Sequence, residues 1–185
     1  MDSLRSLAAE LSIPERTLRR AAGEGLIRGR RVSPRRFRTS LREEMYLHSH
    51  WKLLHSLREA LRTEPNVKLA VLFGSTAVGA DREDSDLDIL VALTDPALGR
   101  LADLAGRLTR RLDREVQLVR LQDAERSPVL MSAILDEGRT LIDREQRWSA
   151  LLADKPKWQR HARNVEDPLT ETAESLELHE SAASR

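Results

Sequence analysis

The sequence predicts an α+β protein built from two modules, and three observations indicate this organisation. Two apolar runs at 69–73 and 89–93 read as buried strands, and they flank a polar loop that ends in paired acids. Helix-like and strand-like patterns alternate after the second run. The third observation is a division of charge, because residues 1–42 carry a net charge of +7 and leave −6 for the remainder. This division predicts that the first module contacts a polyanion and that the second does not.

The composition favours a soluble cytoplasmic protein. With 185 residues, the chain is long enough for one domain of ordinary size and a small additional module. It contains no cysteine, which excludes a disulfide framework and a thiolate metal site. No run of 18 apolar residues is present, and the first residues lack the pattern of a signal peptide. We therefore expect no association with membranes.

Residues 1–40 read as two short helices followed by a hairpin. Apolar spacing predicts the first helix over 4–11 and the second over 14–22, with Ser12 as the N-cap of the second. The arginine-rich segment 26–38 reads as a β-hairpin with Pro34 in its turn.

This module resembles winged helix-turn-helix DNA-binding domains. The resemblance implies that the second helix and the hairpin contact DNA. The candidate contacts are Thr17, Arg19, Arg20, Arg28, Arg30, Arg31, Arg35, Arg36 and Arg38. The alternative is a small packing or dimerisation module with a solvated basic face, and in the dimerisation case the protein would be a homodimer.

A longer helix over 41–62 is predicted to connect the two modules within the segment 41–63. Its leucines and a tryptophan form one apolar side that packs on one of the modules. Three histidines, His48, His50 and His55, lie on this helix, and we interpret them as surface or interface residues rather than metal ligands.

The loop between the two predicted strands carries the candidate chemistry. Gly74 and Ser75 end the first strand, and Asp86 and Asp88 lead into the second. Alternation along a strand places the two carboxylates on one face, roughly 6.5–7 Å apart. Mg²⁺ or Mn²⁺, bound through carboxylates and substrate phosphates, is the expected partner of such a pair. Gly74 lets a phosphate approach the backbone closely, and the Ser75 hydroxyl can donate to it. The alternative is a hairpin with solvated acids, which the position of the acids at a strand start disfavours.

This stretch resembles the signature of the minimal nucleotidyltransferases, a branch of the polymerase-β-like superfamily. The residues in register with that signature are Gly74, Ser75, Ala77, Gly79, Ser85, Asp86 and Asp88. The resemblance implies a small mixed sheet with helices packed on one side, here over residues 64–155. It also implies transfer of a nucleoside monophosphate from a nucleoside triphosphate (NTP) to a hydroxyl on a protein, an RNA or a small molecule. Asp86 and Asp88 would hold the metal, and Gly74, Ser75, Arg82 and Ser85 would contact the nucleotide.

One position departs from the family pattern. Relatives carry a third carboxylate in a later strand, where it helps to bind metal and acts as general base. In the predicted strand 115–121 that position is Gln117, which has no negative charge. Glu115, two residues earlier on the same face, is the candidate replacement, and the alternative is a solvated acid at the strand end. Val78 is a second departure, because many relatives carry arginine there.

The remainder of the second module continues the α+β pattern. Helices are predicted over about 95–111, with Asp95 or Thr94 as cap, and over 128–137, where Ser127 and Pro128 begin the helix; a short strand follows at 140–142. Residues 156–185 are expected to form a C-terminal helix and a polar, disordered tail.

Two functions from different classes follow from these patterns. The first is a metal-dependent nucleotidyltransferase with a DNA-binding N-terminal module. The second is a DNA-binding regulator or antitoxin whose transferase domain is weak or inactive and serves as a nucleotide sensor or as a surface for a partner such as a toxin. Gln117 is the residue that favours the second interpretation.

Overall fold

The computed structural model describes residues 3–33, 36–82 and 84–165 of the chain. The N-terminal module consists of α1 (Ser3–Glu10), α2 (Glu15–Gly23) and an antiparallel hairpin of β1 (Arg30–Ser33) and β2 (Arg36–Arg38). The predicted order of two helices and a hairpin is confirmed. Pro34, expected in the hairpin turn, lies outside the described residues.

The predicted N-cap of the second helix is wrong. Ser12 has a left-handed backbone with φ 55°, and Pro14 occupies the cap position of α2 without a side-chain hydrogen bond. Ser12 therefore makes the turn between the helices instead of capping the second one.

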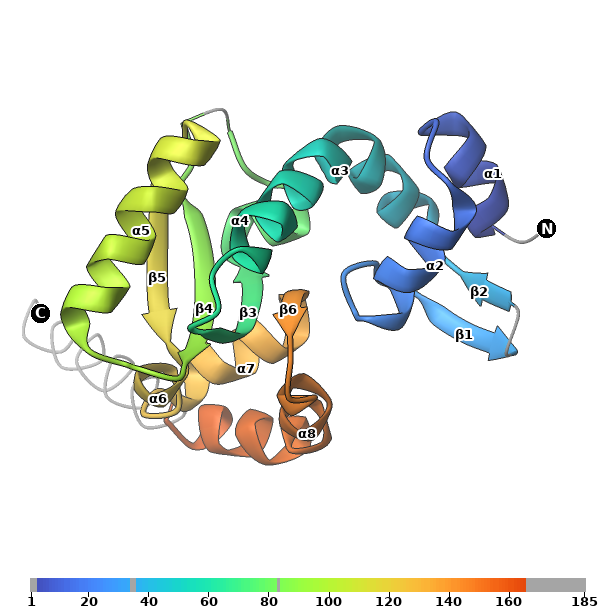
Figure 1. Cartoon of the computed structure of the whole chain (residues 1–185). Coiled ribbons are helices and arrows are strands. Elements are labelled where there is room, and N and C mark those ends of the chain that lie inside the picture. The colour runs from blue at the N-terminus through green and yellow to red at the C-terminus, as the bar shows by residue number, and fades with distance from the viewer. Residues whose placement is uncertain (1–2, 34–35, 83, 166–185) are drawn as a thin grey trace, which may run out of the picture.

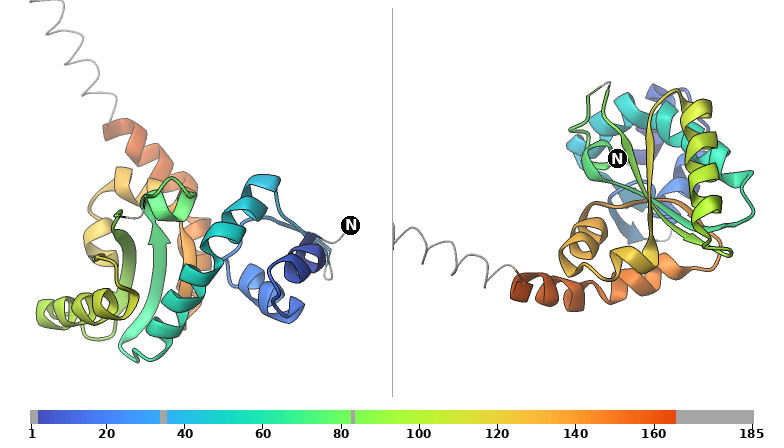
Figure 2. Two further views of the ribbon diagram at one scale, coloured as in Figure 1. Left: turned by 90° about the horizontal axis from the view of Figure 1, so that it is seen from above. Right: turned by 90° about the vertical axis from the view of Figure 1, so that its left-hand side faces the viewer.

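Helix α3 (Leu41–Arg62) follows, and it begins with Ser40, whose side chain accepts a hydrogen bond from the Glu43 amide. In Figures 1 and 2, α3 runs from the N-terminal module to the larger unit and forms the connection between them. The helix predicted over 41–62 is confirmed with the same bounds.

The larger unit is organised around a four-stranded mixed sheet. Its strands are β3 (Val67–Phe73), β4 (Leu87–Leu93), β5 (Val116–Arg120) and β6 (Arg139–Asp143), in the order β5-β4-β3-β6. The pairs β3–β4 and β3–β6 are antiparallel, whereas β4 and β5 are parallel. The mixed sheet is therefore confirmed.

The helices of this unit are α4 (Gly74–Val78), α5 (Leu98–Leu112), α6 (Leu121–Ala124), α7 (Pro128–Glu137) and α8 (Arg147–Ala153). Helix α7 begins at Pro128 as predicted, and the Ser127 side chain accepts a hydrogen bond from the Leu130 amide. The predicted cap of α5 at Asp95 or Thr94 is wrong, because Ala97 occupies the cap position without a side-chain hydrogen bond. The chain is helical again from 155 to 165, and the predicted polar tail from 166 onward lies outside the described residues. No helix in the described part of the chain has the length and apolar character to span a bilayer.

The expectation that helices pack on one side of the sheet is wrong. Successive β4 residues join two different clusters, so that Ile89 and Val91 pack with α3 and α5, whereas Leu90 packs with α6, α7 and α8. The physical reason is visible in the strands themselves, because continuous apolar runs such as 69–73 indicate burial of both sheet faces. Figure 2 shows helices on either side of the sheet.

The first of these clusters continues without a break into the N-terminal module. Leu18, Leu26 and Ile27 from the module lie in the same cluster as Leu47 of α3 and Leu141 of β6. The N-terminal module is therefore packed against the larger unit and is not tethered by α3 alone.

Candidate active site

The turn from β3 into α4 brings the backbone directly against a carboxylate. Gly74 has a left-handed φ of 71°, and a Cβ at this position would lie 2.5 Å from Asp88 Oδ2. Any side chain here would displace the Asp88 carboxylate and would strain the backbone. In this structure the group close to Gly74 is the Asp88 carboxylate, and the approach of a phosphate to this glycine stays a prediction.

The paired aspartates come from the start of β4. Asp86 precedes the strand and Asp88 lies inside it, in parallel register with Gln117 of β5. The Gln117 amide Nε2 donates to Asp86 Oδ2 at 2.5 Å. Burial, together with the negative charge of Asp86, raises the pKa of Asp88 above its ordinary value. The two carboxylates and the amide therefore form one site, in which the acids repel each other.

The donor set fits a hard cation that completes its coordination with substrate oxygens. Among residues 3–33, 36–82 and 84–165, no group of three His, Cys, Asp or Glu residues is arranged to hold a metal. Asp86 and Asp88 would supply two carboxylate ligands, and the Gln117 amide has an oxygen to offer in addition to the nitrogen that now faces Asp86. Mg²⁺ is commonly held by one or two carboxylates plus phosphates, so this set is sufficient.

The loop before β4 is shaped by hydrogen bonds at Ser85. The Ser85 hydroxyl accepts a hydrogen bond from the Arg82 amide at 2.8 Å, so Ser85 shapes the loop. Arg82 is exposed, and Ser75 lies half-buried in the first turn of α4. The four residues predicted to contact the nucleotide are therefore found in the first turn of α4 (Gly74 and Ser75) and in the loop before β4 (Arg82 and Ser85). Among them, Arg82 is the exposed positively charged side chain.

Arg114 is a residue of this site that the sequence analysis missed. Its guanidinium donates to the Ser85 carbonyl from Nη2 at 2.5 Å and from Nε at 3.0 Å. It also lies 3.3 Å from the Thr76 hydroxyl and from Asp81. Arg114 thereby ties the segment before Asp86 to α4. An arginine placed two residues before the strand that carries Gln117 was the available signal.

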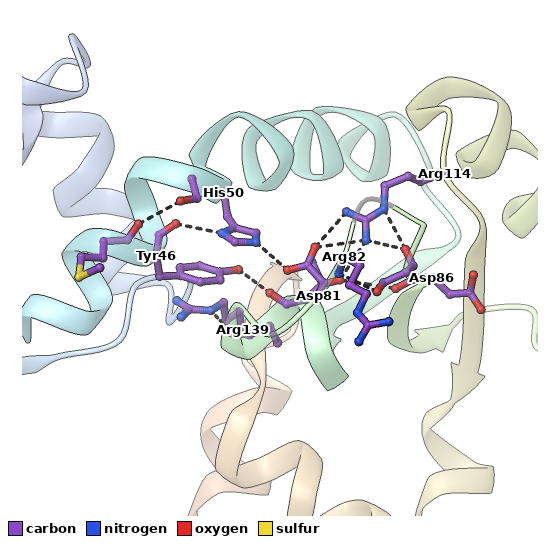
Figure 3. A network of polar contacts seen from close by, with 12 residues as sticks. Tyr46, His50, Asp81, Arg82, Asp86, Arg114 and Arg139 are labelled. Carbon is purple, nitrogen blue, oxygen red and sulfur yellow. Dashed lines mark hydrogen bonds and ion pairs between the residues drawn. The ribbon is translucent and has the colours of Figure 1, made fainter.

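Helix α3 reaches the same loop through His50. The His50 ring stacks on Tyr46 with centroids 4.4 Å apart, and its Nε2 lies 2.8 Å from Asp81 Oδ1 (Figure 3). Burial alone would raise the pKa of Asp81, but the hydrogen bond and charge of His50, with help from Arg114, hold that pKa below its ordinary value. The interpretation of His50 as an interface residue is consistent with these contacts.

A buried arginine connects the N-terminal module to α4. Arg139 is 1% exposed and makes two hydrogen bonds to the Glu43 carboxylate, at 2.6 and 2.8 Å. It also donates to the carbonyls of Ala77 in α4 and Leu26 in the N-terminal module, and its guanidinium lies over the Tyr46 ring. This role was not predicted from the sequence, because Arg139 lies just outside the predicted strand at 140–142.

Comparison with known proteins agrees with this site. The family described as "Polymerase beta, Nucleotidyltransferase" matches residues 55–147. The chain belongs to the polymerase beta nucleotidyltransferase family. The match covers the sheet, the aspartates and Arg114, and it leaves the N-terminal module outside.

Members of this nucleotidyltransferase family with similar sequence or structure include antitoxins. The protein adenylyltransferase MntA of Shewanella oneidensis is 35% identical over 97 residues, which is 51% of this chain and 66% of that relative. A crystal structure of a toxin-antitoxin with AMP-PNP is 26% identical with a TM-score of 0.55, over 65% of this chain and 97% of that one. A mutant MntA-HpeT toxin-antitoxin is also 26% identical, with a TM-score of 0.53 over 64% and 95%. These likenesses place the chain close to the MntA branch of the nucleotidyltransferases.

The candidate base Glu115 lies just before β5 of the nucleotidyltransferase sheet. Its side chain is exposed, and its carbonyl accepts the Leu87 amide at 2.8 Å. Glu115 is therefore adjacent to the strand of the aspartates, and its role in catalysis stays a prediction.

The predicted nucleic-acid contacts divide into exposed and inward-facing groups. Arg20, Arg30, Arg31, Arg36 and Arg38 are exposed, whereas Thr17 and Arg19 are half-buried on α2, and Arg35 lies outside the described residues. Arg28 differs, because its backbone amide donates to Glu43 and its Nη2 is buried without a partner. Burial and the neighbouring Arg139 charge lower the pKa of Arg28, so this residue faces the interior rather than a ligand.

Proposed function

We propose that this protein is a metal-dependent nucleotidyltransferase that moves a nucleoside monophosphate from an NTP to a hydroxyl of a partner protein, and that its N-terminal module binds DNA. The observation that carries the enzymatic part is the close approach of Gly74 to Asp88 beside Asp86. At this end of the sheet, the backbone at Gly74, which has no side chain, lies beside two carboxylates and a short polar loop.

The reaction forms one bond and breaks one. The acceptor oxygen attacks the α-phosphorus of the NTP, and the bond to the bridging oxygen of the β-phosphate breaks, so that pyrophosphate leaves with the electron pair. A divalent cation on Asp86 and Asp88 would neutralise the charge that develops on the phosphate oxygens. Ser75 and Arg82 would hold the outer phosphates, and Arg114 would keep Asp86 in place through Ser85. Glu115 is the proposed acceptor of the hydroxyl proton.

A hydroxyl on a partner protein is the acceptor that the relatives favour. The similar MntA protein is a protein adenylyltransferase, and the similar solved structures are toxin-antitoxin complexes. We therefore propose ATP as the donor and a toxin as the partner.

The DNA-binding part of the proposal is supported by charge and exposure. The hairpin exposes Arg30, Arg31, Arg36 and Arg38, and residues 1–42 carry a net charge of +7. Arginines contribute to affinity mainly through phosphate contacts, which release counterions.

A second candidate function is supported by Gln117. An amide in place of the third carboxylate is a poor ligand for a second hard cation and cannot accept the hydroxyl proton. In this alternative the domain binds nucleotide and presents a partner surface without efficient transfer.

Labelled ATP distinguishes the two functions. The purified protein is incubated with α-labelled ATP, Mg²⁺ and a co-expressed partner toxin, and transfer of label to the partner is measured. An enzyme transfers label only with the cation present, and Asp86→Asn combined with Asp88→Asn abolishes both the transfer and the cation-dependent binding of ATP. Cation-dependent binding without transfer supports the sensor. Equal binding by wild type and double variant refutes the metal site.

The DNA-binding proposal is tested separately. The affinity for random duplex DNA should fall steeply as salt rises, and Arg36→Glu with Arg38→Glu should weaken binding for all sequences. The control Arg100→Glu changes an exposed arginine on α5 of the larger unit. Absence of binding at low salt, or an equal loss in the control, favours the packing or dimerisation module.

A further inference from the structure

A cavity lies between the N-terminal module and the β6 edge of the sheet. Its volume is about 680 Å³, within the range of about 300–1,000 Å³ usual for small-molecule sites. The residues that line it and carry the argument are Arg20 of α2, Arg58 and Arg62 of α3, and Thr140, Arg144 and Trp148 from the β6–α8 region. We call this space the interface cavity. Figure 1 shows β6 on the side of the sheet that faces the N-terminal module.

The lining of the interface cavity has more positive than negative charge. Four arginines line it, against two acids, Glu24 and Asp143. Both oxygens of Asp143 already accept the backbone amides of Arg147 and Trp148, at 2.9 and 3.0 Å.

The other acid of the lining, Glu24, forms ion pairs with both Arg20 and Arg58. Although burial would raise the pKa of Glu24, the hydrogen bond from Arg20 and the charge of Arg58 lower it, as expected where cations outnumber acids. The lining therefore keeps a net positive charge with Glu24 ionised.

Two buried polar atoms in the lining lack partners. Among the described residues, Arg58 Nε and Thr140 Oγ1 are both buried without a hydrogen bond, in side chains that belong to residues 9% and 1% exposed. A buried unpaired donor costs free energy, and such atoms in a native protein commonly mark a binding position. Both atoms would be satisfied by an oxygen-rich ligand.

We propose that the interface cavity binds a small organic or inorganic oxyanion, with phosphate or carboxylate groups held by Arg58, Arg62 and Thr140. Guanidinium groups suit such ligands because their planar donors match two oxygens at once. The recessed position of Arg58 and Thr140 excludes the backbone of duplex DNA from these atoms.

A ligand in this position would contact both parts of the protein at once. Arg20 belongs to the N-terminal module, whereas Thr140 belongs to the sheet and follows Arg139, which holds the Ala77 carbonyl of α4. The bound anion therefore stabilises the packed arrangement of the two parts, independently of nucleotide at the aspartates.

The test titrates full-length protein with inorganic phosphate and, separately, with citrate. Both titrations are made in EDTA, without nucleotide and at constant ionic strength set by NaCl. Calorimetry and the thermal midpoint are the readouts, since a ligand that binds only the folded state raises the midpoint saturably. Saturable binding of phosphate or of citrate supports the site and identifies the preferred group.

Thr140→Val is the decisive variant because it keeps the shape of the side chain and removes only an unpartnered hydroxyl, so the fold is retained. It should weaken binding about fivefold, and Arg62→Gln should weaken it about tenfold or more. The control Arg100→Gln removes the same charge from a distant exposed position and should bind as wild type does. The proposal is overturned if neither anion binds saturably to the wild type, or if Thr140→Val and Arg62→Gln bind as tightly as Arg100→Gln.

Discussion

The ion pair between Glu43 and Arg139 provides the most demanding test of how the two parts are held together. Both side chains are buried, with exposures of 5% and 2%, and the pair makes two short hydrogen bonds. Glu43→Gln would leave the guanidinium charge buried, with only the carbonyls of Leu26 and Ala77 and the Tyr46 ring around it.

Breaking a buried pair in this way costs about 3–5 kcal/mol. For a chain of this size each kcal/mol corresponds to about 2–4 °C, so the thermal midpoint should fall by roughly 6–20 °C. Urea unfolding followed by circular dichroism measures the free energy of unfolding directly.

The matched control for Glu43→Gln is Glu59→Gln on the same helix. Glu59 pairs with Arg62 at 2.6 Å, but both side chains are more than 40% exposed, so its loss should cost about 0.5 kcal/mol or less. Combining Glu43→Met with Arg139→Met should cost about 2–3 kcal/mol less than the sum of the single changes, since the pair is coupled. A loss below about 1 kcal/mol for Glu43→Gln would refute the view that removing Glu43 leaves an uncompensated buried charge on Arg139.

Three further predictions concern the active site and can be tested on the same preparations. Gly74→Ala should lower nucleotidyl transfer about 100-fold or more, because its Cβ would displace Asp88, one of the two carboxylates proposed to hold the metal. Gly99→Ala, in which the added Cβ meets no atom within 4 Å, should leave the rate unchanged, and equal rates in both variants would contradict the argument. Gln117→Asp should raise the rate of nucleotidyl transfer by up to about 10²–10⁴-fold while the affinity for ATP changes little. An unchanged rate would indicate that Glu115 acts as the third carboxylate. Asp81 has a lowered pKa, so its stabilisation is present above the ordinary aspartate pKa and is lost as pH falls through the lowered value. Asp81→Asn should therefore destabilise the protein at pH 7 and progressively less toward about pH 3 in urea unfolding, and a pH-independent difference would contradict this assignment.

The residues of the candidate active site that could be predicted from the sequence are those that lie close together along the chain. Gly74, Asp86 and Asp88 occur within fifteen residues, and the flanking apolar runs predict the strands that hold them. Short helices escaped prediction, because α4 and α6 have only five and four residues and show no helical period.

Residues that act across the fold could not be predicted in the same way. Arg114 reaches Ser85 from 29 positions away, and Arg139 reaches Glu43 from 96 positions away. Neither contact follows from local pattern, because each depends on the packing of β5 beside β4 and of α3 against β6. Helices on both sheet faces were predictable in principle, since residues 69–73 are apolar without alternation.

The continuous packing between the N-terminal module and the sheet determines how this chain can be dissected. Leu26 and Ile27 are almost fully buried, and the Gly25 carbonyl accepts the Thr140 amide at 3.2 Å. A fragment that begins at residue 41 would therefore expose to water the apolar face of α3 and the unpaired edge of β6. Both exposed surfaces promote aggregation. The intact chain should melt in one cooperative transition rather than two, because neither part keeps a closed core without the other.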